Sequence, residues 1–109
     1  HMKVIIIDNR VHRHQQLIDM IDQSFEENDV QTFSAMHLDR LRELKPDLLL
    51  VHENNPEAAA IENDPTYATY TILFSGGLTG NWPETEYLYS AGIKYIPQAL
   101  SEISRHMCL

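Results

Sequence analysis

Cysteine is almost absent from the sequence, since Cys108 is the only one among its 109 residues. A lone cysteine has no disulfide partner within the chain. No cluster of basic residues flanks Cys108, and basic neighbours are what activate a thiol as a nucleophile. We therefore interpret Cys108 as an inert thiol near the end of the chain.

Positive charge is also scarce. Eight Lys and Arg residues stand against sixteen Asp and Glu residues, which gives a formal net charge of −8 at pH 7. A chain of this charge repels a phosphate backbone, and it has no basic stripe to neutralise one. The sequence therefore predicts no binding of DNA or RNA by this chain.

Long apolar runs and targeting segments are missing as well. No stretch is long and apolar enough to cross a bilayer, so we predict no membrane association. The chain does not open with a Lys-rich leader, an apolar segment and a small-residue cleavage site, so we expect a cytoplasmic location. His1 before Met2 is typical of an expression-vector remnant, and we assign it no function.

The usual motifs of catalysis and cofactor binding do not occur. The sequence has no GxSxG, HExxH, Walker or dinucleotide fingerprint. Gly76-Gly77 is too short to hold a phosphate and is interpreted as a tight turn. His12 and His14 lie two residues apart near the start of a predicted helix, so they do not share a helical face. We therefore predict no cofactor, no metal site and no enzymatic activity.

Apolar runs alternate with segments of helical periodicity along the chain. The runs KVIIID at 3–8 and DLLLV at 47–51 are continuous, which is typical of strands buried on both faces of a sheet. This alternation predicts one α/β domain, residues 1–109, with a parallel sheet covered on both faces and right-handed crossovers. We predict strands at 3–8, 30–33, 47–51, 71–74 and 94–96. Helices are predicted from 11 to 26–29, from an N-cap at Ser34 to 45, at 57–61, at 83–90 and at 100–107, with 63–70 left open between a loop and a frayed helix end.

Candidate site residues follow from the predicted sheet. In an open parallel sheet, ligands bind beyond the carboxyl ends of the strands. The residues that close the predicted strands are Asp8, Asn9, His52, Ser75, Pro97 and Gln98.

Four segments, in this order, carry a resemblance to a known family: VIIIDN at 4–9, KPDLLLVHENNP at 45–56, ILFSGG at 72–77 and AGIKYIPQA at 91–99. They resemble strands one, three, four and five of the receiver domains of two-component response regulators. The resemblance extends over essentially the whole chain. It implies a flavodoxin-like (βα)5 doubly wound sheet of five parallel strands in the order 2-1-3-4-5, here with short third and fifth helices.

The resemblance also identifies what the chain has lost. Receiver domains accept a phosphoryl group on an aspartate at the end of the third strand, where this chain has His52. They hold Mg²⁺ with two carboxylates after the first strand, where this chain has Asp8 and the neutral amide Asn9. Gln98 replaces the lysine that neutralises the phosphoryl oxygens, whereas Ser75 matches the family's hydroxyl residue. The resemblance therefore implies a degenerate pseudo-receiver without phosphorylation chemistry.

His52 and its neighbour leave two alternatives open. His52 itself is a candidate for phosphorylation, although it lacks the divalent ion and lysine that stabilise charge in phosphoryl transfer. Glu53 is a candidate to rebuild a metal site with Asp8, although neighbouring residues of an extended segment point to opposite faces. We favour a polar loop residue at position 52 and a solvated glutamate at position 53.

Large side chains gather in and around the predicted fourth helix: Trp82, Tyr87, Leu88 and Tyr89. One buried stripe of a short helix cannot hold all of them. Some of these side chains are therefore either packed in the core or exposed at an interface, and both alternatives stay open. In receiver domains the face of helix four, strand five and helix five binds partners or a second copy, and Tyr95 matches its aromatic position. We therefore predict a phosphorylation-independent module that binds a protein partner or itself through Tyr87, Leu88, Tyr89 and Tyr95.

Two other classes of function are weighed against this one. A small-molecule or nucleotide sensor would use the vacated pocket lined by Asn9, His52, Ser75 and Gln98. A flavodoxin-like enzyme would need an activated nucleophile or a cofactor motif, and the sequence contains neither. The sensor is therefore the second hypothesis.

Overall fold

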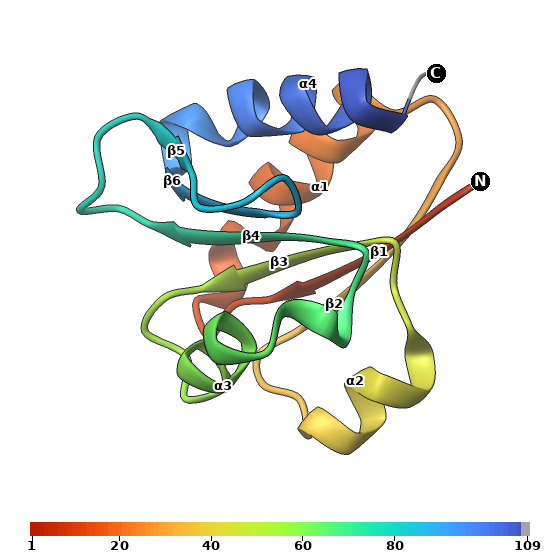
Figure 1. Cartoon of the computed structure of the whole chain (residues 1–109), viewed down its shortest axis with the longest axis vertical. Helices are drawn as coiled ribbons and strands as arrows, with labels where there is room; N and C mark the ends of the chain where they lie inside the picture. Colours follow the sequence, from red (N-terminus) through yellow and green to blue (C-terminus); the bar gives the residue numbers. More distant parts are fainter. Residues whose placement is uncertain (108–109) are drawn as a thin grey trace.

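Six strands form one central sheet in the structure, a computed structural model that describes residues 1–107 (Figure 1). The strand order is β2-β1-β3-β4-β6-β5, and every neighbouring pair is parallel except β5 and β6. The strands are β1 (Met2–Ile7), β2 (Asn28–Phe33), β3 (Leu48–His52), β4 (Tyr70–Ser75), β5 (Asn81–Pro83) and β6 (Leu88–Gly92).

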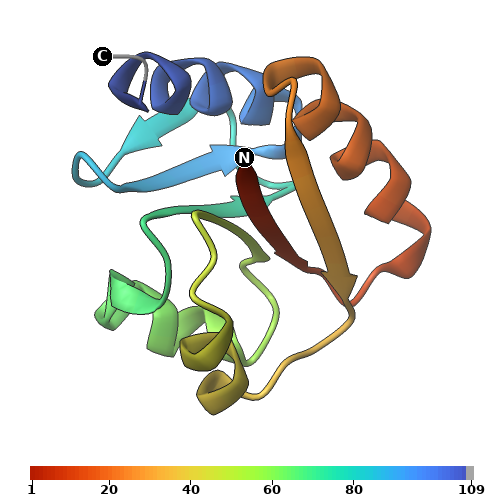
Figure 2. The same ribbon diagram turned by 90° about the vertical axis from the view of Figure 1, so that its right-hand side faces the viewer.

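Four α-helices cover the two faces of this sheet. Helices α1 and α4 lie together on one face, and α2 and α3 lie on the other (Figures 1 and 2). The helices are α1 (His14–Ser24), α2 (Leu38–Leu44), α3 (Glu57–Asn63) and α4 (Ile96–Met107). Three short 3-10 helices lie between helices and strands of the described residues: η1 (Val11–Arg13), η2 (Pro65–Tyr67) and η3 (Ile93–Tyr95). Within residues 1–107, no helix has both the length and the apolar character needed to cross a membrane.

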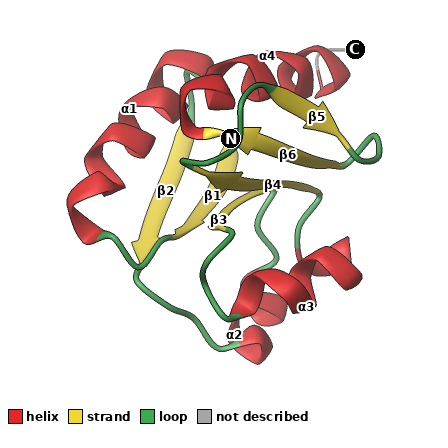
Figure 3. Ribbon diagram, turned by 90° about the vertical axis from the view of Figure 1, so that its left-hand side faces the viewer, coloured by secondary structure: helices red, strands yellow, loops and turns green. Residues whose placement is uncertain are grey.

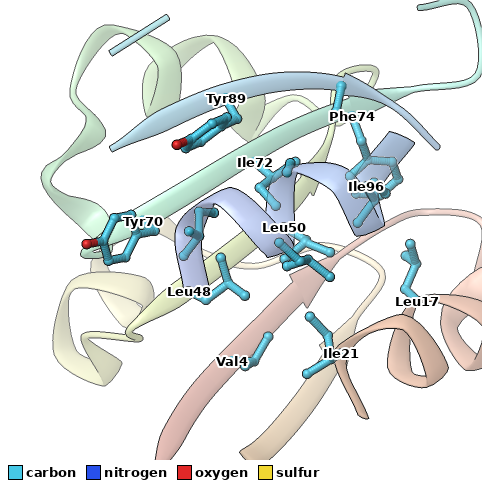
Figure 4. Packing of buried hydrophobic residues seen from close by; sticks show 14 of the residues in the cluster. Val4, Leu17, Ile21, Leu48, Leu50, Tyr70, Ile72, Phe74, Tyr89 and Ile96 are labelled. Atoms are coloured by element: carbon cyan, nitrogen blue, oxygen red, sulfur yellow. The ribbon is translucent and has the colours of Figure 1, made fainter. Parts of the chain in front are cut away.

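The apolar runs of the sequence produce two hydrophobic cores, one on each side of the sheet. Side chains alternate along a strand, so Leu50 of β3 faces α1 and α4 while Leu49 faces α2 and α3. The first core includes Leu17, Phe74 and Ile96, and Figure 4 shows them from separate elements in one cluster with Leu50. Each fully buried Leu or Ile contributes about 1.5–3 kcal/mol of hydrophobic stabilisation. Because β1 and β3 contribute residues to both cores, the positions of their ends are fixed by this packing.

The first part of the fold agrees with the sequence-based prediction. The predicted α/β class is confirmed, as are the first four strands with their order 2-1-3-4 and the first three helices. The second helix begins at Leu38, so the predicted N-cap at Ser34 is wrong, and His37 precedes the first turn without a side-chain cap. The open segment 63–70 holds η2, where Asp64 accepts a hydrogen bond from the Thr66 N–H. Cys108 lies outside the described residues.

The predicted fourth helix at 83–90 is wrong, because this segment belongs to an antiparallel hairpin formed by β5 and β6. The Thr85 hydroxyl accepts hydrogen bonds from the N–H groups of Tyr87 and Leu88, which closes a turn in place of a helix. Tyr89 and Leu88 then face opposite sides of the sheet and are buried in different cores. This alternation of buried side chains between the two faces has the two-residue period of a strand, and pairing with β4 stabilises the strand conformation.

The last strand and helix are also displaced from their predicted positions. Residues 94–96 do not form a strand, because β6 ends at Gly92 and η3 follows it. Helix α4 begins at Ile96 and has 12 residues, so the prediction of a short last helix at 100–107 is wrong. Ile96, Leu100 and Ile103 are buried at helical spacing, and Pro97 is tolerated in the first turn. The sheet therefore has six strands instead of the predicted five, and β6 lies between β4 and β5.

Candidate functional site

A buried ion pair lies at the carboxyl end of β1. Nε of Arg13 donates to Oδ2 of Asp8 at 2.6 Å, and a second guanidinium nitrogen donates to Oδ1 at 2.8 Å. Both side chains are buried. The guanidinium therefore engages both carboxylate oxygens in a two-point, charge-assisted contact.

The backbone around Asp8 holds this pair in place. The Arg10 N–H donates to Oδ1 of Asp8 at 3.0 Å, and Nε2 of His14 donates to the Asp8 carbonyl oxygen at 2.7 Å. The short helix η1 thereby turns the chain so that Arg13 returns toward the end of β1. Burial acts to raise the pKa of Asp8, but the hydrogen bonds from Arg13 and Arg10 outweigh it and keep the pKa below its ordinary value of 3.8.

His52 closes β3 beside this ion pair. Its side chain is only 3% exposed, and its ring meets the ring of Phe74 edge to face at a centroid distance of 5.3 Å. Nδ1 of His52 accepts a long hydrogen bond of 3.4 Å from the Asn54 N–H. Burial, followed by the positive charge of Arg13, lowers the pKa of His52 below 6.5, while Asp8 opposes this effect. The site therefore disfavours the charged form of the imidazole.

Phe74 connects the histidine to the arginine. The guanidinium carbon of Arg13 lies 5.6 Å from the centroid of the Phe74 ring, within the range of a cation–π contact. The same ring contacts His52. Asp8, Arg13, His52 and Phe74 therefore form one packed cluster on the side of the sheet that faces α1 and α4.

Asn55 ties together the loops that surround the cluster. Its side-chain oxygen accepts from the Asn9 N–H at 3.2 Å, and its side-chain nitrogen donates to the Ser34 carbonyl at 2.9 Å. These bonds join the loops after β1, β2 and β3. Asn55 is itself buried, so it fixes the loops without presenting a side chain to solvent.

The structure brings some predicted site residues together and separates others. Asp8 and His52 share the cluster, but the side chain of Asn9 is exposed. The Ser75 hydroxyl accepts from the Gly77 N–H at 3.1 Å, within its own loop. Gln98 is exposed on α4 and does not follow a strand. Within residues 1–107, no hydrogen bond joins Ser75 or Gln98 to Asp8 or His52.

The predicted interaction face is divided in the structure. Tyr87 and Tyr95 are 48% and 39% exposed, but they lie before and after β6, near opposite ends of that strand. Leu88 and Tyr89 are 5% and 2% exposed and belong to the cores. The expected face of helix four, strand five and helix five is therefore not present, because its first helix is replaced by the hairpin.

Two residues of the site were not anticipated, namely Arg13 and Asn55. Rules that inspect only the ends of strands miss Arg13, because it reaches the site from the following 3-10 helix. A usable signal was the cation five residues after Asp8, in the segment DNRVHR. Asn55 carried the weaker signal of an amide before proline in a loop, which is common in turns without any site.

Among residues 1–107, no group of three or more His, Cys, Asp and Glu side chains is arranged to hold a metal ion.

No family model, curated protein or solved structure matches this chain. Function is therefore inferred from the geometry and chemistry of the site.

Proposed function

We propose that this chain is a phosphorylation-independent pseudo-receiver that acts by binding another protein. The observation that carries the proposal is the ion pair between Arg13 and Asp8, in which both carboxylate oxygens accept from the guanidinium. An internal cation thus neutralises the acid that would otherwise attract a divalent ion. The order 2-1-3-4 of the first four strands is also that of a flavodoxin-like sheet, which supports the family resemblance.

Phosphoryl transfer at this edge of the sheet would require several changes at once. A divalent cation would have to displace Arg13 and leave a buried guanidinium without its carboxylate, which is costly. His52 stands at the position of the phosphoryl acceptor, and its ring is covered by the protein. A phosphodonor would therefore reach it only after the residues packed around it had moved.

Recognition of a protein is supported by the aromatic side chains left at the surface. Trp82, Tyr87 and Tyr95 are each at least 39% exposed, and aromatic residues are common anchors of interfaces. Trp82 and Tyr87 both belong to the hairpin, at β5 and in the turn before β6. Contacts through Tyr87 and Tyr95 therefore remain part of the proposal, as two separate anchors.

The sensor hypothesis has less support. Its four pocket residues would have to converge, but Ser75 is bonded within its own loop and Gln98 is exposed on α4. Arg13 is bonded to Asp8, Phe74 contacts His52, and Arg13 and Phe74 also contact each other. A metabolite screen that raises the melting temperature of the wild type, but not of His52→Ala, would favour the sensor instead.

The test is an amide NMR titration with beryllofluoride and Mg²⁺, which together mimic a phosphoryl group. We expect the amides of Asp8, His52 and Ser75 to keep their positions. Arg13→Ala is the comparison variant, because it removes the cation from the Asp8 carboxylate and does not change the residue at position 52. Saturable shifts at these amides in the wild type would overturn the proposal.

The partner itself is sought by affinity capture from native extract. The bait is the wild-type chain, and Tyr87→Ser and Tyr95→Ser are the comparison baits. Both side chains are largely exposed, so these changes leave the cores intact. We expect at least one variant to lose a protein that the wild type retains, and equal capture by all three baits would contradict the assignment of these anchors.

A further inference from the structure

The two edges of the sheet differ in how well they are protected. At one edge, β5 has three residues and includes Pro83, which has no N–H to offer to another strand. At the other edge, β2 has six residues and no proline. In the part of the chain that the structure describes, β2 pairs with β1 alone, and Figure 3 shows it as the outermost strand on its side.

The backbone of β2 directs part of its hydrogen-bonding groups away from the sheet. The N–H groups of Met2 and Asp8 donate to the carbonyls of Glu27 and Phe33, at 2.9 Å in both cases. Inward and outward backbone groups alternate along a strand paired on one side. The N–H and C=O groups of Asn28, Val30 and Thr32 therefore point outward, and they are the groups that another strand would bind.

The surroundings of this edge are strongly acidic. No Lys or Arg occurs between Arg13 and Arg40, whereas this stretch contains Asp19, Asp22, Glu26, Glu27, Asp29 and Asp39. Asp22, Glu26, Glu27 and Asp29 are exposed in the end of α1, the following turn and β2 itself.

Two cations that lie against β2 are engaged away from its acidic residues. Lys3 is the register partner of Asp29, but its ammonium group donates to the Leu44 carbonyl at 2.6 Å. Arg40 stacks over the ring of Phe33, at the opposite end of the strand, at 6.0 Å. The amino-terminal half of β2 therefore keeps an excess of negative charge.

We propose that the outer edge of β2 binds an extended, lysine- or arginine-rich segment of a partner protein by adding it as a seventh strand. Main-chain hydrogen bonds to Asn28, Val30 and Thr32 hold the segment, and the acidic side chains select a basic one. The inference rests on the proposed function only in that both assign protein recognition to this chain. It uses a different surface from Tyr87 and Tyr95.

A second copy of this chain fits the edge less well. Pairing two β2 strands would join two molecules that each carry Glu27 and Asp29 at this edge. Like charges placed side by side are destabilising, and each molecule carries a formal charge of −8. Charge complementarity therefore favours a basic partner over self-association.

The test uses a defined probe, the N-acetylated nonapeptide KTKTKTKTK, titrated into the labelled full chain at low salt. We expect saturable amide shifts along β2 and slower hydrogen exchange at Asn28, Val30 and Thr32. The acidic peptide ETETETETE is expected to bind at least about tenfold more weakly, and about 0.5 M NaCl is expected to weaken binding of the basic peptide. Shifts scattered over all acidic surfaces, without slower exchange at these three amides, would overturn the proposal.

Two variants separate backbone pairing from simple charge attraction. Val30→Pro removes one outward N–H while the inward groups of β2 remain, and Val30→Ala is its matched control because it loses similar packing but keeps the N–H. We expect the proline variant alone to weaken binding by about tenfold. Should Val30→Pro unfold, the double variant Asp29→Asn with Glu27→Gln tests the contribution of the acidic side chains to peptide binding. Unchanged binding of the basic peptide by that double variant would contradict the inference.

Two further outcomes are distinguishable from these. A dimer that forms without peptide, and that Val30→Pro abolishes, would replace the basic partner by a second copy and overturn the proposal. Beryllofluoride-dependent shifts at Asp8 and His52 would overturn the proposed function, but they would leave the result at β2 unchanged.

Discussion

Arg13 donates to both carboxylate oxygens of Asp8, and its guanidinium also lies over the ring of Phe74. The pair is buried, so each charge depends on the other for its stabilisation. Breaking such a pair on one side leaves an uncompensated charge, whereas replacing both members by apolar groups is often tolerated. This asymmetry makes the role of the pair measurable.

Arg13→Ala is expected to lower the free energy of unfolding by about 3–5 kcal/mol, because Asp8 is then buried without its cation. Urea denaturation at pH 7 measures the change. The double variant Asp8→Leu with Arg13→Met is expected to be closer to the wild type than Arg13→Ala alone. A loss below about 1 kcal/mol in Arg13→Ala would mean that the pair behaves like an exposed one.

The pKa of His52 predicts a dependence of stability on pH. Because its pKa in the folded state lies below the ordinary value of 6.5, the unfolded chain takes up the proton first as the pH falls. The free energy of unfolding is therefore fully retained above pH 6.5 and decreases as the pH falls through the lowered pKa. Urea denaturation between about pH 7.5 and 5.5 is expected to show a smaller decrease in His52→Gln. His37→Gln, at an exposed histidine, is the control, and equal slopes in wild type and His52→Gln would refute the prediction.

Gly92 is required for space, since a Cβ built on it would lie 2.1 Å from the Leu78 carbonyl oxygen. The loop after β4 crosses β6 at this point, and the Gly92 N–H donates to the Gly80 carbonyl at 3.0 Å. Gly92→Ala is expected to cost about 3 kcal/mol, at the upper end of the range for overpacking. Gly76→Ala is the control, because its Cβ would meet nothing within 4 Å, and thermal unfolding compares the two. Similar melting temperatures would contradict the close approach.

The hydroxyl of Thr71 offers an opportunity to stabilise the chain. Among residues 1–107, this buried oxygen in β4 has no hydrogen-bond partner. Thr71→Val keeps the shape and removes the unpaired group, so the free energy of unfolding is expected to rise by about 1 kcal/mol. Thr71→Ser keeps the hydroxyl and loses a methyl group, so it is expected to be less stable than the wild type. If valine proves destabilising, the hydroxyl has a partner in solution.

The elements that could be predicted from the sequence are those with a local signature. The runs that form β1 and β3 are apolar throughout because both faces of these strands are buried, and Pro46 limits the end of α2. The segment from Pro83 to Ser90 contains good helix formers after a proline, so its local pattern favoured a helix. Its strand form depends on pairing with β4, which is distant in sequence.

The candidate site was predictable in location but not in content. The ends of β1 and β3 were correctly expected to place Asp8 and His52 together, since parallel strands end at one edge of a sheet. The ion pair depends on how η1 turns the chain, and a strand-end rule contains no information on that turn. Gln98 was misplaced because the strand expected at 94–96 is a 3-10 helix followed by α4.

The insertion of β6 between β4 and β5 imposes an order on chain assembly. During synthesis β5 emerges before the strand that will pair with it, and β4 keeps a free edge until residues 88–92 arrive. A chain shortened after Tyr87 would therefore leave β4 exposed and β5 without a neighbour. Formation of this corner of the sheet is expected to be a late, concerted event, with α4 closing over Tyr89 at the end.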